Sequence, residues 1–384
     1  MNDLPRLTES DVRARRLSRH ALTAPSKTAR PADIAAAMAS THAQVMSAAE
    51  LAVAMRIDGA TRLDVREALW SERSLVKTYG LRGTVHFMAA RDLSLWVGAL
   101  SALPAAPNTQ PPGVRLTTDQ TEEVVAAVAA ALDDAELTID ELTEAVVERA
   151  GSWAGDLVME AFQGKWPRWR QAMALAGMRG VLCFAPNRGR KVAYTNPRRW
   201  LPGFEPADAR TALPWLVTSY LYAYGPSTPR RFAHWLGVPA TWAKDLFGSM
   251  GEALQEVEVE GESAWIAAGD LDVPADPPQG VRLLPYFDGY AYRVGNQPPA
   301  SLYPGRAAER VLPGNYQILL VDGVVAGLWH QHRSGRKISI TVEPLGELTA
   351  AQLRDLDDQV DRVGQISEGT PRLTIGPVPV GGHA

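Results

Sequence analysis

Two basic turns and one pair of histidines have the residue types and spacings that most directly suggest chemistry. The turns are Arg188-Gly189-Arg190-Lys191 and Arg333-Ser334-Gly335-Arg336-Lys337, and each is expected at a hairpin tip, where Arg and Lys can bind phosphate. Basic turns that are simply solvated occur nearly as often, so both turns are candidate sites only. His330 and His332 would share one face of a strand, as two metal ligands do, but no third ligand is evident and we predict no metal site.

Charge is distributed unevenly along the chain, although the formal net charge is only −4. Residues 119–160 contain twelve carboxylates and a single Arg, whereas residues 161–204 contain nine Lys and Arg and no carboxylate. A polyanionic partner requires a local basic face and not a positive total. The same distribution is expected if the acidic and basic spans pair with each other, and the sequence leaves both interpretations open.

Length and composition indicate a globular protein of two or three domains, because 384 residues exceed one ordinary core. Hydrophobic residues make up 46% and charged residues 21%, which excludes a wholly disordered chain. We found no membrane-length apolar stretch and no apolar segment of a secretory signal near the N-terminus. The single cysteine, Cys183, cannot form an internal disulfide. These features predict a cytoplasmic protein without membrane contact.

The same order of elements, three helices followed by a hairpin, is expected three times in the first 270 residues. The first group has helices at 8–21, 34–38 and 61–70 and strands at 75–79 and 84–88; the second has helices at 118–132, 138–149 and 165–176 and strands at 181–185 and 191–195; the third has helices at 208–224, 228–236 and 240–254 and strands at 255–259 and 263–267. Three helices closed by a two-stranded wing are typical of a winged helix.

Two proline-rich segments, 104–114 and 272–280, separate the first two groups and end the third. Beyond the second segment the pattern changes to strands and one closing helix, as in a small barrel or curled sheet. We therefore predict an α+β protein with three tandem winged-helix modules and a C-terminal small β-barrel. The expected ranges are 1–103, 115–200 and 205–270 for the modules, 281–366 for the barrel and its helix, and 367–384 for a tail.

Five strings in this order carry a resemblance to a known family. They are LVKTYGLRGTVH at 75–86, YLYAYGP at 220–226, RFAHWLG at 231–237, LLPYFDGY at 283–290 and VDGVVAGLW at 321–329. Together they resemble the winged-helix DNA glycosylase family typified by AlkZ and YcaQ, over nearly the whole chain. The resemblance implies a C-shaped arrangement around a DNA channel and excision of alkylated purines, especially N7-alkylguanines and cross-linked adducts. It also implies a self-resistance role in bacteria that produce DNA-alkylating antibiotics.

The family's catalytic signature, Gln-x-Gln or Gln-x-Asp, corresponds here to His42-Ala43-Gln44. The resemblance thus implies that His42 and Gln44 are catalytic, with His42 in place of the usual first Gln. Arg82 and His86, in the first hairpin, are further candidates for DNA contact, because they lie closer to this motif in the sequence than the two basic turns do. The expected partner is double-stranded DNA carrying an alkylated purine, bound by a monomer that uses no cofactor.

These two residue types suit the chemistry of N7-alkylguanine. The alkylated base is cationic and departs without a strong acid, so the protein must place a water and stabilise the sugar cation. With an ordinary pKa near 6.5, His42 could accept the water's proton, while Gln44 could orient that water. None of the six lysines lies near His42 in the sequence, which favours a monofunctional enzyme over a lyase. The alternative is that both residues are structural.

Two other functions remain open at this point. A non-catalytic winged-helix DNA-binding protein or transcriptional regulator would share the predicted fold, although regulators usually dimerise on two half-sites. A protein that sequesters a DNA-alkylating drug would bind the drug without releasing a base.

Overall fold

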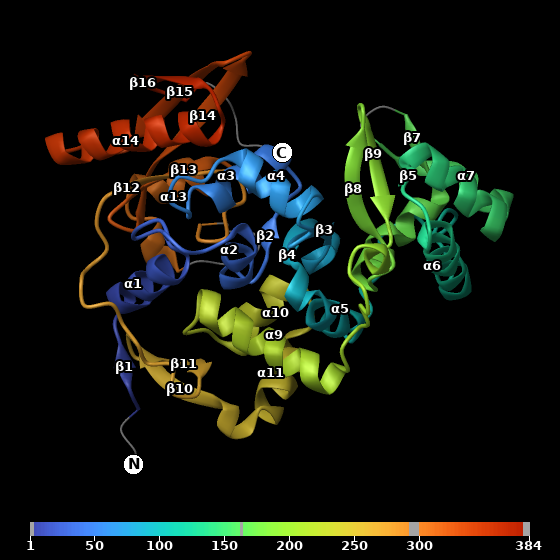
Figure 1. Ribbon diagram of the computed structural model, residues 1–384. Helices are drawn as coiled ribbons and strands as arrows, with labels where there is room; N and C mark the ends of the chain where they lie inside the picture. Colours follow the sequence, from blue (N-terminus) through green and yellow to red (C-terminus); the bar gives the residue numbers. More distant parts are fainter. Residues whose placement is uncertain (1–3, 162–163, 292–298, 379–384) are drawn as a thin grey trace. The chain divides into compact units, whose positions relative to one another are not determined.

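The computed structural model describes residues 4–161, 164–291 and 299–378, and the chain forms two compact units (Figure 1). The first unit combines residues 1–68 with 217–384, so both ends of the chain contribute to it. The second unit is the continuous stretch 69–216. No helix among the described residues is long and apolar enough to span a bilayer.

Among the described residues of the N-terminal part of the first unit, four short helices and a two-residue strand follow β1 (Arg6–Leu7). They are α1 (Glu9–Arg19), α2 (Pro31–Ala37), β2 (Thr41–His42), α3 (Met46–Ala54) and α4 (Arg62–Trp70), which continues into the second unit. At the start of α1, the Thr8 side chain accepts a hydrogen bond from the Asp11 backbone, and the Asp11 carboxylate accepts one from Thr8. The capping box expected at this point is therefore present.

Helix α3 is a feature that the sequence pattern does not indicate. All residues from 48 to 54 are buried, so the helix is apolar on all sides and lacks the amphipathic period by which a surface helix is recognised. The helix begins two residues after Gln44, and it therefore fixes one end of the segment that carries the candidate catalytic residues.

The third predicted group of helices and strands is present. It consists of α9 (Ala209–Tyr224), which begins in the second unit, α10 (Pro229–Leu236), α11 (Ala240–Ser249), β10 (Leu254–Val259) and β11 (Glu262–Ala267). Tyr220 packs against Phe232 and Trp235 at ring-centroid distances of 5.1 and 4.8 Å, which joins α9 to α10. The two strands pair antiparallel, and β1 (Arg6–Leu7) adds to β10 in parallel.

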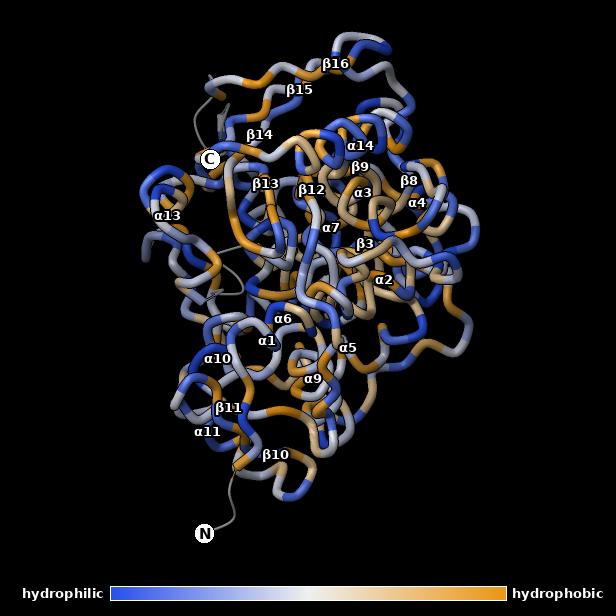
Figure 2. Tube along the Cα trace, turned by 90° about the vertical axis from the view of Figure 1, so that its left-hand side faces the viewer, coloured by the Kyte–Doolittle hydropathy of each residue, from blue (hydrophilic) through white to orange (hydrophobic). Residues whose placement is uncertain are grey.

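A curled five-stranded sheet forms the C-terminal part of the first unit. Its order is β12 (Val281–Leu284), β13 (Gln317–Val321), β14 (Val324–Ser334), β15 (Lys337–Pro344) and β16 (Thr370–Ile375). The first four strands are antiparallel, and β16 pairs in parallel with β15 after α14 (Ala350–Ile366). The hydropathy colours alternate along α14, as expected for a helix with one buried face (Figure 2).

This sheet differs from the expectation in two respects. The described strands form an open row, which fits a partial barrel and not a closed one. The segment expected as a tail contributes β16 to the sheet, with Leu373 paired to Ile340. A parallel strand that follows a helical crossover produces no short-range turn signal, so this pairing is not visible in the sequence.

The second unit contains helices and three hairpins. Its helices are α5 (Leu93–Ser101), α6 (Thr118–Leu132), α7 (Ile139–Ala150) and α8 (Met173–Met178). The short helix α13 (Arg306–Val311) belongs instead to the first unit. The hairpins pair β3 (Leu75–Tyr79) with β4 (Val85–Ala89), β6 (Leu157–Glu160) with β7 (Lys165–Pro167), and β8 (Cys183–Arg188) with β9 (Lys191–Thr195), which also pairs with β5 (Leu137–Thr138). The first and third hairpins were expected.

The helix expected over 165–176 is wrong in its first half. Lys165–Pro167 form strand β7, a 3-10 turn follows, and α8 begins only at Met173. Pro167 restricts Trp166 to extended conformations, which favours the strand over a helical start. The indole face of Trp166 is covered by the Arg170 guanidinium, 4.1 Å from the ring centroid.

Candidate active site

His42 and Gln44 lie on a short connection between α2 and α3 in the first unit. His42 is half-buried and Gln44 is exposed, whereas Ala43 between them is fully buried. Before this connection, Ala39 and Ser40 have φ values of 49° and 80°, and the Ser40 N–H donates to Ala35 O at 2.9 Å. The chain therefore reverses sharply at the end of α2 and presents His42 and Gln44 on either side of a buried anchor.

Phe287 lies against His42. The two ring centroids are 4.7 Å apart with an interplanar angle of 42°. Phe287 follows β12 by three residues and is half-buried. Its φ of 61° lies in the left-handed region, where a bulky side chain costs about 1–3 kcal/mol. This conformation persists only because the neighbouring residues are strongly held.

A buried ion pair holds the chain immediately after Phe287. The two Asp288 carboxylate oxygens accept hydrogen bonds from Nη1 and Nη2 of Arg56, both at 2.8 Å. The side chains are 0% exposed for Arg56 and 1% for Asp288. Arg56 Nη1 also donates to Ala52 O at 2.6 Å, so the pair joins the 285–290 segment to the end of α3.

The end of α9 holds the other side of the connection. The Tyr224 hydroxyl donates to Met38 O at 2.7 Å, directly after α2. His20 lies edge-on to the Tyr224 ring at 5.4 Å, and its Nε2 is 2.9 Å from Ala223 O. Burial, followed by the nearby Arg56 charge, lowers the pKa of His20 to about 3. His20 is therefore neutral around pH 7 and acts as a packing and hydrogen-bonding group.

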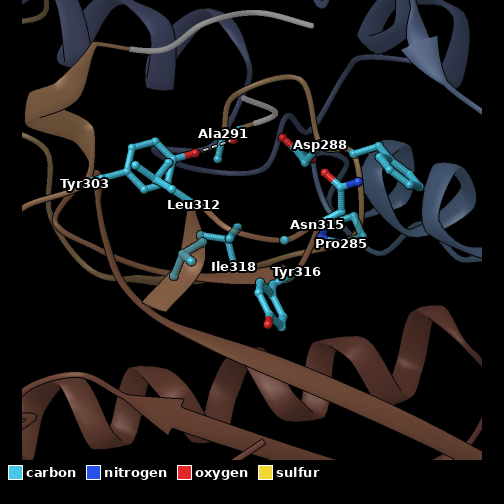
Figure 3. A pocket seen from close by; sticks show the side chains of 11 residues that line it. Pro285, Asp288, Ala291, Tyr303, Leu312, Asn315, Tyr316 and Ile318 are labelled. Carbon is cyan, nitrogen blue, oxygen red and sulfur yellow. Dashed lines mark hydrogen bonds between the residues drawn. The ribbon is translucent and has the colours of Figure 1, made fainter. Parts of the chain in front are cut away.

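A small cavity lies beside the 285–291 segment, and Phe287 and Asp288 are among the residues that line it (Figure 3). Figure 3 shows Tyr303 and Leu312 on one side of it and Asp288 and Asn315 on the other. Its volume is about 30 Å³, and a buried water needs roughly 10–15 Å³. The cavity can hold about two waters, whereas pockets for organic ligands occupy about 300–1,000 Å³. It is too small to receive a purine.

The first two candidate DNA contacts lie in the β3–β4 hairpin of the second unit. Arg82 is half-buried at the turn with φ 54°. His86 is 3% exposed, and its Nδ1 is 3.0 Å from Thr84 O in its own hairpin. Every residue of β4 is buried, so the His86 side chain is enclosed by the protein in this structure.

The β8–β9 turn carries the next three candidates, and two of them are already paired. Arg188 Nη2 lies 3.0 Å from a Glu141 carboxylate oxygen, and Lys191 Nζ lies 2.7 Å from one of Asp140. Arg190, at the tip, is exposed. The basic span thus pairs with the acidic span at this hairpin, and pairing between the two spans recurs elsewhere in the unit, as in Arg179–Glu122, Arg168–Asp156 and Lys165–Glu160.

The β14–β15 turn of the first unit presents the last three candidates. Arg333, Arg336 and Lys337 are all exposed. Arg333 donates to Gly335 O at 2.9 Å and to Ser367 O at 2.5 Å, which orders its guanidinium without neutralising it. Within the same sheet, Nδ1 of His330 is 3.5 Å from the Tyr286 hydroxyl oxygen. The described residues contain no group of three or more His, Cys, Asp or Glu arranged to hold a metal ion.

Comparison with known proteins identifies the family. A family model described as "DNA glycosylase AlkZ-like" matches residues 35–366. This chain belongs to the AlkZ-like DNA glycosylases. The AlkZ-like chain is 33% identical over 364 residues to the interstrand DNA cross-link repair glycosylase of Streptomyces sahachiroi, covering 89% of this chain and 92% of the relative. The solved structure of Streptomyces sahachiroi DNA glycosylase AlkZ aligns with a TM-score of 0.78 at 26% identity, covering 97% of this chain and 100% of that one.

The expected resemblance is therefore confirmed, and the AlkZ-like chain is a DNA-repair enzyme that acts on DNA. The residues that contact His42 or hold the neighbouring segments were not singled out from the sequence, although Tyr224, Phe287 and Asp288 lie within two of the strings that carry the resemblance. Arg56 has no such signal. A local pattern cannot reveal a partner 232 residues away in the chain.

Proposed function

We propose that this AlkZ-like glycosylase hydrolyses the N-glycosidic bond of bulky N7-alkylguanine in double-stranded DNA. It acts as a monofunctional, monomeric enzyme in the cytoplasm, and it protects a bacterium from its own DNA-alkylating antibiotic. The three groups of helices and strands act as winged-helix modules for DNA binding. The name of the relative, an interstrand DNA cross-link repair glycosylase, favours a bulky or cross-linked lesion over a small one.

One observation carries the proposal most directly. His42 and Gln44, at the position of the family's catalytic signature, lie on a connection that is anchored at both ends. Tyr224 holds the turn before it through Met38, and Phe287 packs on the His42 ring. A half-buried imidazole beside an exposed amide offers one group that can take a proton and one that can only orient a water.

The proposed reaction divides the work between these two groups. Gln44 orients a water toward C1′ of the damaged nucleotide, and His42 accepts the proton as the oxygen–C1′ bond forms. The bond from C1′ to N9 breaks, and its electron pair passes to the cationic purine, which leaves as neutral N7-alkylguanine. Because the leaving group already carries a positive charge, no general acid is needed.

Base release from defined DNA tests the proposal. The purified protein is incubated with three duplexes of one sequence: one with a single bulky N7-alkylguanine, one with an interstrand cross-link through guanine N7, and one undamaged. Alkali then cuts any abasic site. We expect cleavage at the lesion in the first two duplexes and none in the third, with a lane without protein correcting for spontaneous depurination. Tight binding without cleavage of either damaged duplex would contradict the proposed substrate class.

We propose that the β14–β15 turn contributes more to DNA binding than the β8–β9 turn. Arg333, Arg336 and Lys337 keep their charges exposed, whereas Arg188 and Lys191 must first leave their carboxylate partners. Counterion release depends on cations that newly engage phosphate, and each such contact contributes about 0.9 to the slope of log K against log salt.

Neutralising each turn is therefore expected to have different effects. Replacing Arg333, Arg336 and Lys337 by Gln should reduce the magnitude of this negative slope by about 2–3. Replacing Arg188, Arg190 and Lys191 by Gln should reduce it by about 1. The slopes are measured by fluorescence anisotropy with labelled undamaged duplex between low and moderate salt. Equal slopes for both variants and the unaltered protein would remove both turns from the DNA-binding surface, and Arg82→Gln would then be the next variant to measure.

A further inference from the structure

Phe287 is in an unusual position for its residue type. A bulky aromatic residue rarely adopts a positive φ, yet Phe287 has a φ of 61°. The glycine of this segment, Gly289, lies two positions later and not at the position that needs the positive φ. A loop that needed only to turn would be satisfied by glycine or asparagine at this point. The conformation therefore requires an explanation in what the side chain contacts.

The chain on both sides of Phe287 is fixed by buried groups. Before it, Leu284 O accepts a hydrogen bond from Trp329 Nε1 at 2.8 Å. After it, Asp288 is held by Arg56, and the Tyr290 hydroxyl donates to Gly323 O at 2.8 Å. These anchors are Arg56, which follows α3, and residues of the sheet and its β13–β14 turn, so the direction of the Phe287 side chain is determined by the frame of the first unit.

The ring so directed contacts His42. The centroids are 4.7 Å apart, and Nδ1 of His42 is buried while the residue as a whole remains half-exposed. The backbone that precedes His42 turns through two residues with positive φ, Ala39 and Ser40. The first side-chain torsion of histidine is confined to staggered positions, whereas the second, which turns the ring, is broad. A packed aromatic face therefore limits the plane that the imidazole can adopt.

We propose that Phe287 is a positioning residue that sets the plane of the His42 imidazole for proton transfer. The inference rests on the catalytic role proposed for His42. Phe287 itself touches no reacting atom in this assignment. A displaced base is expected to reduce the rate constant of the chemical step by about 10- to 100-fold without weakening DNA binding.

Two substitutions separate the ring from the backbone conformation. Phe287→Asn keeps a residue that tolerates positive φ and removes the ring, whereas Phe287→Tyr keeps the ring. We expect the single-turnover rate constant to fall about 10- to 100-fold in the Asn variant and to remain near that of the unaltered protein in the Tyr variant. Dissociation constants for DNA should not change. If the Asn variant unfolds at a lower temperature than the unaltered protein, Phe287→Leu replaces it. This variant keeps apolar volume without an aromatic ring, and the same fall in the single-turnover rate constant is expected.

A double-mutant cycle shows whether the effect passes through His42. In a His42→Ala background, Phe287→Asn should leave the residual rate constant unchanged, because there is no polar side chain left at position 42 to orient. An equal fold loss in both backgrounds would assign Phe287 a general structural role and overturn the proposal.

NMR tests the contact without activity. The His42 ring protons, assigned by their absence in His42→Gln, should shift in Phe287→Asn and keep their positions in Phe287→Tyr, since the ring current comes from the aromatic side chain. If the unaltered protein releases no base from any duplex, the proposed function fails while the NMR comparison still decides the contact. Unchanged His42 resonances in Phe287→Asn would overturn the positioning role.

Discussion

Replacing Asp288 by Asn is expected to destabilise the first unit by about 3–5 kcal/mol. The reason is not the loss of a favourable pair alone. Arg56 is 0% exposed, so the substitution leaves a guanidinium buried without its counter-charge. Urea unfolding, followed by tryptophan fluorescence and by hydrogen exchange of unit-specific amides, measures the change.

Two comparisons make this result interpretable. Replacing both partners together, Arg56→Met with Asp288→Leu, should recover much of the loss, because an apolar pair carries no unpaired charge. The exposed pair of Lys191 with Asp140 is the matched control, and Asp140→Asn should change the free energy of unfolding far less than Asp288→Asn does, because water screens an exposed pair. A loss below about 1 kcal/mol for Asp288→Asn would mean that water reaches Arg56 and that the anchor is weak.

His42→Ala is expected to lower the single-turnover rate constant of base release by about 10²- to 10⁴-fold, the usual contribution of a general base. Gln44→Ala should cost less, because a water can still be activated though less well oriented. His332→Ala is the control, since this exposed histidine belongs to β14 and not to the connection that carries His42. Full activity of His42→Ala would assign the base to another group.

The pH profile gives a second test of His42. The rate constant should fall toward acid as the base becomes protonated, and His42→Gln should lack that limb. Acid also affects folding through His20, whose pKa is about 3 when folded and near 6.5 in an unfolded chain. Between these values the unfolded chain binds the additional proton, so stability falls as the pH is lowered. Both proteins contain His20, and a limb present in only one of them therefore cannot arise from it.

The sequence predicts elements whose signals are local. The boxes at Thr8–Asp11 and Thr138–Glu141 mark the starts of α1 and α7, and the Asn187–Arg190 turn marks the β8–β9 hairpin. Elements without such signals are not predicted from the sequence. Helix α3 is buried on all sides and therefore lacks an amphipathic pattern, and β16 joins its sheet only after a crossover helix. The helix predicted over 165–176 is wrong at β7, because Pro167 favours an extended conformation for Trp166.

The candidate site was predictable only in part. His42 and Gln44 were located through the resemblance, because a lone histidine is more often structural than catalytic. The groups that hold them lie far away in the sequence, as Arg56 and Asp288 do, and only the fold brings them together. His86 shows a different limit of sequence analysis. It was chosen because it lies near the His42 motif in the sequence, but this proximity does not predict that its side chain is exposed.

The composition of the first unit from residues 1–68 and 217–384 has a consequence for synthesis on the ribosome. His42 is added to the nascent chain 245 residues before Phe287. At typical elongation rates of about 5–20 residues per second, this is a delay of roughly 12–50 s. During that interval residues 69–216, which are contiguous, can fold as they emerge. The connection that carries His42 meanwhile lacks its aromatic neighbour, Phe287, and Arg56 lacks the acid that neutralises it. A nascent chain interrupted before residue 288 thus holds the proposed catalytic pair but not the frame that orients it, so the site is assembled only late in translation.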